Sequence, residues 1–523
     1  MKKTFSKILS LVLSVLMLLS AIPLTASAAS VVDSGTCGEN LTWELDSDGV
    51  LTISGTWYME DYEYYNSAPW CEYKASIKRI VINDGVTSIG GYAFHNCTSL
   101  TQITIPEGVT SIGSDAFSGC TSLVQITIPE GVTSIGSYAF YNCKSLTQIT
   151  IPEGVTSIGS CTFYNCTSLT QITIPEGVTS IGSAAFDDCK SLTQITIPEG
   201  VTSIGSSAFD DCTSLTQVTI PESVTSIGSF AFEDCTSLTE ISVDDDNADY
   251  SSLDGVLYNK DKTELICYPA GKTETSFEIP EGVTTIGSKA FYGCSGLTGD
   301  LIIPEGVTEI GRSAFEDCSG FTGSLIIHEG VTEIGSLAFK GCSGFTGDLI
   351  IPEGVTEIGS RAFADCSGLT GDLIIPEGVT TIGGSAFFGC SGFTGSLVIP
   401  EGVTTIGNGT FYNCSGLTGE LIIPEGVTEI GGSAFEDCSG FTGSLIIHEG
   451  VTEIGSLAFQ GCSGLTGDLI IPEGVTTIGY YAFYNCSGFT GELILPDSLT
   501  LIDEYAFDKT NFDHVAFKGT EEQ

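Results

Sequence analysis

The stretch from Leu100 to Ser122, L-T-Q-I-T-I-P-E-G-V-T-S-I-G-S-D-A-F-S-G-C-T-S, decides the fold because the chain repeats it along most of its length. Its cysteine recurs every 23 residues in the first half of the chain and every 24 residues in the second half. The sixteen cysteines stand at positions 97, 120, 143, 166, 189, 212 and 235, then at 294, 318, 342, 366, 390, 414, 438, 462 and 486. A seventeenth unit without the cysteine runs from Phe489 to about Lys509.

The first part of each unit predicts a short strand. Ile103 and Ile105 flank Thr104, and this alternation is expected of a strand with one buried face. Pro106 then ends the strand. We expect a turn at Gly108 and a single helical turn that begins at Gly113. The apolar residues of these later segments that should face inward are Val109, Ile112, Ala116, Phe117 and Cys120.

Every unit therefore directs about eight apolar side chains inward, more than one isolated coil could bury. Stacked coils solve this problem, because strands about 4.8 Å apart then continue one core through the array. The predicted fold class is a repeat solenoid of about seventeen coils.

The pattern L-x-x-I-x-I-P-x-x-V-x-x-I-G-x-x-A-F-x-x-C resembles the BspA-like class of bacterial leucine-rich repeats, from Cys37 to the end of the chain. The segments 34–38, 51–55 and 68–70 are similar to the leader module of that family, and 254–260 with 266–271 to its interruption. The resemblance implies a surface or secreted protein associated with attachment to host proteins or other cells. It implies no catalytic residues.

The amino terminus predicts export. Lys2, Lys3 and Lys7 precede an apolar run from Ile8 to Leu24, which closes on the small residues 26–28, so residues 1–29 are expected to be a signal peptide. A retained membrane anchor is the alternative. No second run is long enough to span a bilayer, so we expect no membrane insertion after cleavage and a secreted or cell-surface-associated product.

The charge excludes some partners. The chain has 65 acidic and 17 basic residues, for a net charge of −48, and loss of the three signal-peptide lysines lowers this to about −51. Nucleic acid and anionic membranes are poor partners for such a field. The 41% of apolar residues nevertheless indicates a packed protein.

We expect four segments after the signal peptide, followed by a short tail. They are an N-terminal β-hairpin cap at 30–74, a first array at 75–243, an inserted loop and hairpin at 244–275, and a second array at 276–510. In the cap, Leu41, Trp43 and Leu45 alternate before a turn, and Leu51 and Ile53 return. The tail at 511–523 is short for a cap, so we expect the natural chain to continue beyond Gln523.

The sixteen repeated cysteines are expected to be reduced and buried. Equivalent positions lie close enough for disulfides, but parallel Cβ directions and two identical neighbours argue against pairing. No C-x-x-C pair is present, which argues against a metal site. Pairing of Cys37 with Cys71 in the cap stays open, and Cys161 and Cys267 stand outside the repeated position.

One outward column differs between the arrays and is the candidate ligand-binding surface. In the first array it consists of threonines, at positions 104, 127, 150, 173, 196 and 219. In the second array it consists of Ile302, Ile326, Ile350, Ile374, Val398, Ile422, Ile446, Ile470 and Ile494. Nine exposed β-branched side chains would form an apolar strip, and such surfaces usually mark interaction sites. The competing account is a register change caused by the extra residue of the 24-residue units.

Other candidate residues have simpler readings. His328 and His448 replace the proline of I-P-E-G inside two identical segments, 313–339 and 433–459, which indicates a duplicated block of five coils. The run at 244–249 resembles a calcium loop weakly, and a solvated turn is the simpler reading. The cap aromatics could stack on sugars or could pack over the core; they are Trp57, Tyr58, Tyr62, Tyr64, Tyr65, Trp70 and Tyr73.

A carboxylate follows the strand in every coil. The column consists of Asp84, Glu107, Glu130, Glu153, Glu176, Glu199, Glu222, Glu281, Glu305, Glu329, Glu353, Glu377, Glu401, Glu425, Glu449, Glu473 and Asp497. Like charges at this spacing repel one another, so we expect cations to stabilise the solenoid. Diffuse sodium could suffice, or calcium could bind weakly; no other cofactor is expected.

These observations favour an adhesin or protein-binding scaffold that uses the strand face of the second array. A protein or glycan on host or other cells is the expected partner. The alternatives are a structural spacer or envelope component, and a carbohydrate-binding accessory protein. No Ser-His-Asp or Cys-His arrangement can be assigned, so we expect no enzymatic activity.

Overall fold

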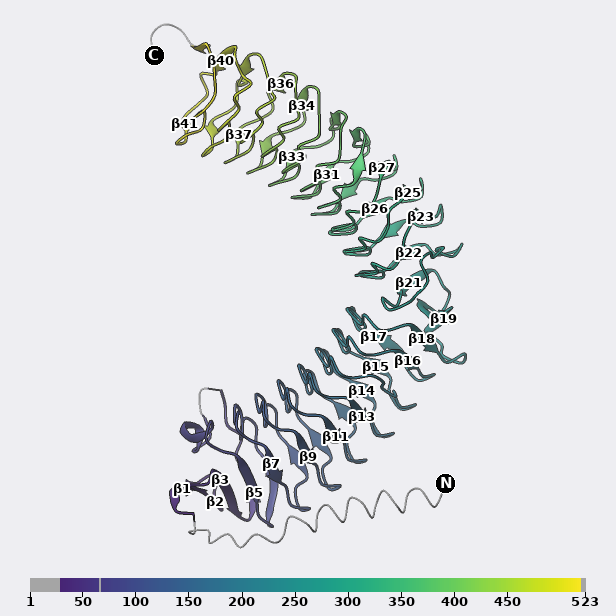
Figure 1. Ribbon diagram of the computed structural model, residues 1–523, viewed down its shortest axis with the longest axis vertical. Coiled ribbons are helices and arrows are strands. Elements are labelled where there is room, and N and C mark those ends of the chain that lie inside the picture. The colour runs from purple at the N-terminus through teal and green to yellow at the C-terminus, as the bar shows by residue number, and fades with distance from the viewer. Residues whose placement is uncertain (1–28, 65–66, 519–523) are drawn as a thin grey trace.

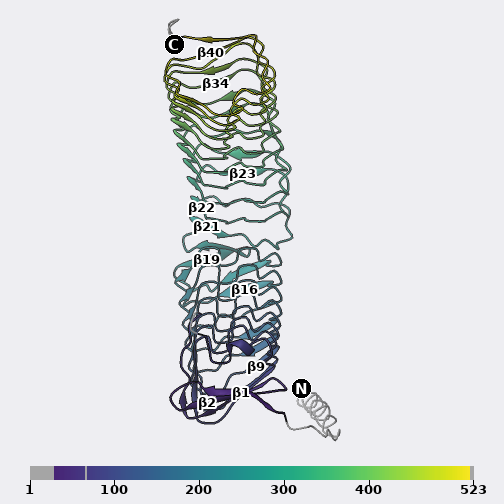
Figure 2. The same ribbon diagram turned by 90° about the vertical axis from the view of Figure 1, so that its left-hand side faces the viewer.

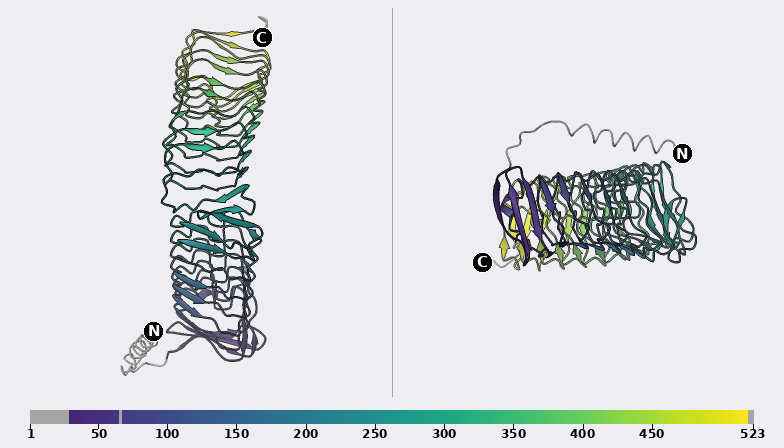
Figure 3. Two further views of the ribbon diagram at one scale, coloured as in Figure 1. Left: turned by 90° about the vertical axis from the view of Figure 1, so that its right-hand side faces the viewer. Right: turned by 90° about the horizontal axis from the view of Figure 1, so that it is seen from below.

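The computed structural model describes residues 29–64 and 67–518, so the predicted signal peptide lies outside the described residues. The chain forms a curved solenoid of about 18 turns (Figure 1). Viewed from either side of the curve, the coils stack into one elongated column (Figure 2 and the left panel of Figure 3). Within the described residues the only helical element is the 3₁₀ turn Cys71–Tyr73. The predicted solenoid fold is confirmed.

Most coils contribute a strand to each of two columns of parallel strands, one column more than the sequence led us to expect. The outer column contains β5 (Arg79–Ile82), β7 (Gln102–Thr104), β9 (Gln125–Thr127), β11 (Gln148–Thr150), β13 (Gln171–Thr173), β16 (Gln217–Ile220), β18 (Glu240–Val243), β23 (Leu301–Ile303), β25 (Leu325–Ile327), β27 (Gly347–Asp348), β29 (Leu369–Thr370), β30 (Leu373–Ile374), β32 (Leu397–Val398), β34 (Leu421–Ile423), β36 (Leu445–Ile447), β38 (Leu469–Ile470), β40 (Glu492–Leu495) and β42 (His514–Phe517). The inner column contains β4 (Trp57–Tyr58), β6 (Val86–Ile89), β8 (Ser111–Ile112), β10 (Ser134–Ile135), β12 (Ser157–Ile158), β14 (Ser180–Ile181), β15 (Ser203–Ile204), β17 (Ser226–Ile227), β21 (Glu264–Cys267), β22 (Thr285–Ile286), β24 (Glu309–Ile310), β26 (Glu333–Ile334), β28 (Glu357–Ile358), β31 (Thr381–Ile382), β33 (Thr405–Ile406), β35 (Glu429–Ile430), β37 (Glu453–Ile454), β39 (Thr477–Ile478) and β41 (Leu501–Ile502).

The two columns occupy opposite rims of the curve. Strands such as β27, β36 and β40 lie toward the convex rim, whereas β31, β37 and β41 lie toward the concave rim (Figure 1). The hydrogen bonding agrees with this placement: six successive strands of the inner column pair within one sheet, but in the second array the outer column breaks into sheets of two or three. Coils on the convex side of a curve must spread apart, so pairing is interrupted there more often.

The segment that we expected to form a helical turn consists of three overlapping β-turns, because Ser118 N–H also donates to Asp115 O at 3.1 Å. Ala116 N–H donates to Gly113 O at 3.4 Å, and Cys120 N–H donates to Phe117 O at 3.1 Å. Within these turns, Asp115 and Gly119 have φ angles of 56° and 74°. These are left-handed values that do not occur in a right-handed α-helix. The left-handed residues turn alternate N–H groups toward the next coil, so a ladder between coils replaces the bonds of a helix.

Phenylalanines and cysteines form the continuous core. Phe117, Phe140 and Phe163 stack with ring centroids 5.5 and 5.6 Å apart. The thiol of Cys143 donates a hydrogen bond to Phe117 O at 3.2 Å, and the same contact recurs along the array. Burial raises the pKa of Cys143 to about 12. All twenty cysteines are free and the sixteen repeated ones are buried, as the sequence predicted.

The N-terminal cap is a three-stranded antiparallel sheet that continues into the outer column. It consists of β1 (Val31–Thr36), β2 (Leu41–Asp46) and β3 (Val50–Gly55), and β2 alternates buried and exposed residues as predicted. Trp70 starts the aromatic stack, with its ring 5.7 Å from that of Phe94. Cys37 and Cys71 are both free thiols, which leaves no disulfide in the cap.

The inserted segment forms the hairpin β19 (Tyr250–Leu253) and β20 (Val256–Asn259), followed by β21. β21 pairs with β22, but β17 pairs with no strand beyond it among the described residues. The buried apolar residues accordingly form two clusters, which meet in the hairpin at Val256 and Leu257. At the C-terminal end, β42 extends the outer column, and Ile502 and Phe517 remain exposed.

Candidate functional site

The outward column of the second array forms an exposed apolar strip on the convex rim. Eight of its nine members, from Ile302 to Ile470, are exposed, with exposed fractions between 37% at Ile446 and 68% at Ile350. Ile494 is half-buried, and its strand pairs with β42 at Ala516. The neighbours of each exposed residue within the strand, such as Leu301 and Ile303, are buried. The predicted side-chain orientation is therefore observed, and the competing register change is wrong.

The additional residue of the second array is accommodated before the strand. Gly299 and its counterparts, such as Gly371, adopt positive φ, at 78° and 77°, and form a bend that lengthens the loop. Asp300 follows this glycine, and its Oδ1 accepts a hydrogen bond from Ser324 N–H of the next coil at 2.7 Å. Because the additional residue lies in this bend, the residues that immediately precede each I-P-E-G keep the same inward and outward directions as in the first array.

Carboxylates border the strip on both sides. One row stands two residues before the outward residues of the strip and comprises Asp300, Asp348, Asp372, Glu420, Asp468 and Glu492, all of them exposed. The other row is the predicted carboxylate column, represented here by Glu353, Glu377, Glu401 and Glu425. Glu401 accepts a hydrogen bond from Glu425 N–H at 3.2 Å, so one carboxylate is held against the next coil. The surface is an apolar band with acidic borders.

The matching face of the first array is polar. Its outward threonines are exposed, and a shallow hollow over β9, β11 and β13 is lined by the Gln-Ile-Thr triplets of three successive strands. Threonine side chains on the other faces bond neighbouring coils; Thr133 Oγ1, for example, donates to Thr110 O at 3.4 Å. Two faces of the same fold thus differ in chemistry while their backbones match.

The predicted carboxylate column does not converge on metal-sized sites. Within the described residues, one group of three acidic side chains has ligand atoms within 4.8 Å of one another, and it comprises Asp210, Glu233 and Asp234. Burial raises the pKa of Asp210 to about 7, and the negative charge of Glu233 is the next largest cause. Burial likewise raises the pKa of Asp187 to about 7, and the negative charge of Asp188 is the next largest cause. We did not anticipate this cluster, although the 23-residue spacing of Asp210 and Glu233 in the sequence indicates that the two lie on neighbouring coils.

The acidic run at 244–249 is a structural turn. Asn247 is fully buried, and its amide donates hydrogen bonds to Pro221 O at 2.8 Å and Val224 O at 2.9 Å. Lys260 Nζ donates to Asp245 O at 3.1 Å and to Asn247 O, so an ammonium group already uses two carbonyls of the turn. This geometry agrees with the simpler reading.

Two of the histidines and two of the cap aromatics occupy structural positions. His328 and His448 are half-buried, and His328 N–H donates to Ile303 O at 3.3 Å, a bond that proline could not make. Trp70 and Tyr62 pack in the core of the cap with ring centroids 5.9 Å apart. Tyr65 lies outside the described residues. Trp57 and Tyr58 are exposed, with ring centroids 6.1 Å apart.

A family comparison matches almost the whole repeat region. The BspA type leucine rich repeat model matches residues 70–190, 133–253, 267–394, 346–466 and 393–513. The chain belongs to the BspA-type leucine-rich repeat family. The resemblance inferred from the motif is thereby confirmed.

Solved structures of leucine-rich repeat proteins are similar to this BspA-type chain. A leucine-rich repeat protein from Eubacterium ventriosum is 26% identical, with a TM-score of 0.50 over 82% of this chain and 94% of its own. A leucine rich cell surface protein from Faecalibacterium prausnitzii is 31% identical, with a TM-score of 0.48 over 75% of this chain and 94% of its own. No curated protein matches the chain. Among the described residues, no helix has the length and apolar character needed to cross a membrane.

Proposed function

We propose that this leucine-rich repeat protein is a secreted or cell-surface scaffold that binds a partner protein through the apolar strip of its second array. The observation that carries the proposal is the strip itself, in which Ile350 and Ile374 have exposed fractions of 68% and 54%. Contiguous apolar surface of this kind is usually covered by a partner. The name of the similar Faecalibacterium protein, a cell surface protein, supports the location.

The acidic borders favour a partner with an apolar ridge between basic side chains. A second copy of this chain would present the same carboxylates, and like charges facing each other across an interface are costly. Basic borders on a partner would meet Asp348 and Asp372 on one side and Glu353 and Glu377 on the other. We therefore infer a cationic partner protein, and we propose no catalytic role for the chain.

Binding measurements on the immobilised chain, residues 30–523, test the proposal. The chain is presented to extracellular-matrix proteins, mucin and polysaccharides, and each affinity is measured by surface plasmon resonance. For the partner found, the joint substitutions Ile350→Thr, Ile374→Thr, Val398→Thr and Ile422→Thr should weaken binding by about tenfold or more, since buried apolar contacts dominate such interfaces. The melting temperature should not change, because these side chains are already exposed.

The matched control substitutes outward residues of the first array, with Thr127→Ser, Thr150→Ser and Thr173→Ser introduced together. This variant should bind as the unmodified chain does. Equal binding by the strip variant would exclude the strip, and binding of polysaccharides alone would favour the alternative function. That alternative is a carbohydrate-binding accessory protein, which the exposed pair Trp57 and Tyr58 favours.

A further inference from the structure

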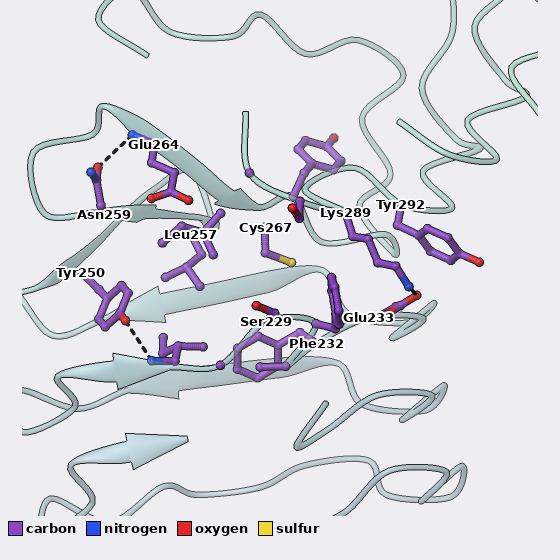
Figure 4. A pocket seen from close by; sticks show the side chains of 18 of the residues that line it. Ser229, Phe232, Glu233, Tyr250, Leu257, Asn259, Glu264, Cys267, Lys289 and Tyr292 are labelled. Atoms are coloured by element: carbon purple, nitrogen blue, oxygen red, sulfur yellow. Dashed lines mark hydrogen bonds and ion pairs between the residues drawn. The ribbon is translucent and has the colours of Figure 1, made fainter. Parts of the chain in front are cut away.

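A cleft of about 400 Å³ lies at the junction of the two arrays. Its walls come from the last coil of the first array, the inserted hairpin and the first coil of the second array. Figure 4 shows Phe232 and Glu233 from one wall, Tyr250 from the hairpin, Glu264 from the following strand β21, and Lys289 from the opposite wall. The cleft therefore lies where the insertion interrupts the stacking of coils.

The interruption leaves one row of backbone donors without acceptors. In the preceding coil, Ser207, Phe209 and Asp211 donate their N–H groups to the next coil at 2.9–3.0 Å. The equivalent N–H groups of Phe230, Phe232 and Asp234 have no hydrogen-bond acceptor among the described residues, and all three residues line the cleft. In the insertion, Tyr268 N–H alone resumes this ladder, and it donates to Ala290 O at 2.7 Å.

The charged side chains that line the cleft are predominantly acidic. Glu233, Asp234, Asp249 and Glu264 contribute four carboxylates, and Lys289 contributes the only ammonium group among the described lining residues. Lys289 Nζ contacts the carboxylate of Glu233 and lies 4.7 Å from the ring centroids of both Phe230 and Tyr292. The cleft thus already accommodates one basic side chain, between a carboxylate and two aromatic rings.

We propose that this cleft binds an extended, basic peptide segment of a partner protein. Donors on every second residue match the carbonyls of an extended chain, which point to one side on every second residue. Addition of a strand to an open row of backbone groups is a known mode of peptide recognition. The carboxylates select lysine or arginine side chains on that segment. The site is separate from the convex strip, so neither proposal depends on the other.

Hydrogen–deuterium exchange of the free protein tests whether the donor row is open. The segment 229–235 should exchange at least about tenfold faster than its equivalent 206–212, because backbone bonds between coils protect only the latter. Equal protection of the two segments would mean that the row is closed, and the proposal would then be wrong.

Fluorescence anisotropy with a labelled probe tests the ligand class. The probe is a blocked hexapeptide of alternating lysine and valine, and the control peptide alternates glutamate and valine. The basic probe should bind saturably at one site and slow the exchange of segment 229–235, whereas the acidic peptide should not bind. Absence of saturable binding by the basic probe would overturn the proposal.

A pair of variants separates the cleft from general attraction to an acidic surface. Ser288 is an exposed residue of the cleft wall, and Ser360 is its exposed equivalent in an uninterrupted coil. Ser288→Trp should weaken binding of the basic probe by about tenfold or more. The indole ring would occupy part of the cleft and prevent several hydrogen bonds between the peptide and the protein. Ser360→Trp should leave the affinity unchanged. Equal affinities of the two variants would show binding elsewhere and exclude the cleft.

Discussion

The first and second arrays share a backbone and a core but expose different surfaces. On the convex rim, threonine in the first array corresponds to isoleucine or valine in the second. On the concave rim, the outward serine of strands such as β10 corresponds to glutamate in β24, β26, β28, β35 and β37. Inward positions hardly change, because each must stack on its own equivalent in the next coil. The comparison shows that a solenoid can acquire a new surface without altering its core.

The largest expected effect comes from opening the core that both arrays share. Phe186 stacks on both neighbouring phenylalanines at 5.4 Å, and Phe435 stacks on its neighbours at 5.2 and 5.3 Å. Phe186→Ala and Phe435→Ala should each cost about 3–5 kcal/mol of unfolding free energy. Because the buried residues form two clusters, we expect two calorimetric transitions, with one lowered by each substitution. A single transition that shifts equally for both variants would mean that the junction couples the arrays.

The second prediction exchanges the convex surfaces. Thr127→Ile, Thr150→Ile and Thr173→Ile together should give the first array an apolar band and increase the fluorescence of a bound apolar dye such as ANS. Stability should change by less than about 0.5 kcal/mol per substitution, because the positions are exposed. Unchanged dye fluorescence would show that outward isoleucine alone does not make an apolar surface, and the contrast between the arrays would lose its functional meaning.

The third prediction concerns pH, which should affect the first array more than the second. The folded pKa values of Asp187 and Asp210, both about 7, lie above those of an unfolded chain, so the folded state binds protons more tightly between about pH 4 and about pH 7. Stability should therefore rise as the pH falls from about 8 toward 5. The equivalent positions in several coils of the second array hold Lys340, Ala364 and Phe388.

Thermal melts of the variant with both Asp187→Asn and Asp210→Asn check this cause. The pH dependence of the first transition should become flatter, whereas that of the second should stay the same. A first transition that keeps its full pH dependence would assign the effect to the general negative charge of the chain.

The smallest expected effect is stabilisation by cations, which should act on both arrays. Carboxylates about 4.8 Å apart repel by roughly 0.9 kcal/mol per pair in bulk water, and salt screens this repulsion. The melting temperature should rise with sodium chloride concentration. A melt with calcium at matched ionic strength distinguishes two causes. Bound calcium ions would raise the melting temperature further, whereas diffuse screening would not. A melting temperature that is independent of salt would contradict the expected repulsion.

The sequence was sufficient to predict the solenoid, the buried cysteines and the outward orientation of the apolar strip. These features follow from periodicity, since a residue such as Ile350 occupies the same environment as Ile326 one unit earlier. The overlapping β-turns in place of a helical turn were not predicted. Apolar spacing from Ala116 to Cys120 fits a helix equally well, and only the left-handed conformations of Asp115 and Gly119 distinguish the two.

The junction was less predictable because it departs from the repeat. The hairpin could be recognised, but the open donor row depends on where the insertion leaves the next coil, which no local pattern specifies. The acidic group of Asp210, Glu233 and Asp234 similarly arises from contacts between coils. Side chains one repeat apart in sequence become neighbours in space, so such clusters have to be sought at the spacing of the repeat.

The two identical segments 313–339 and 433–459 have a consequence for how such a molecule can grow. Lys340 Nζ contacts Glu316 Oε1 at 2.7 Å, and five coils later Gln460 Nε2 contacts Glu436 Oε1 at 2.7 Å. Both copies of the block therefore make the same contact between coils, although the amine of Lys340 is replaced by the amide of Gln460. Since neighbouring coils within an array offer each other the same two faces, a whole number of coils can be added to or removed from an array without creating a new interface. The length of the molecule can thus change in steps, and each added unit of the second array also adds one outward apolar residue to the strip.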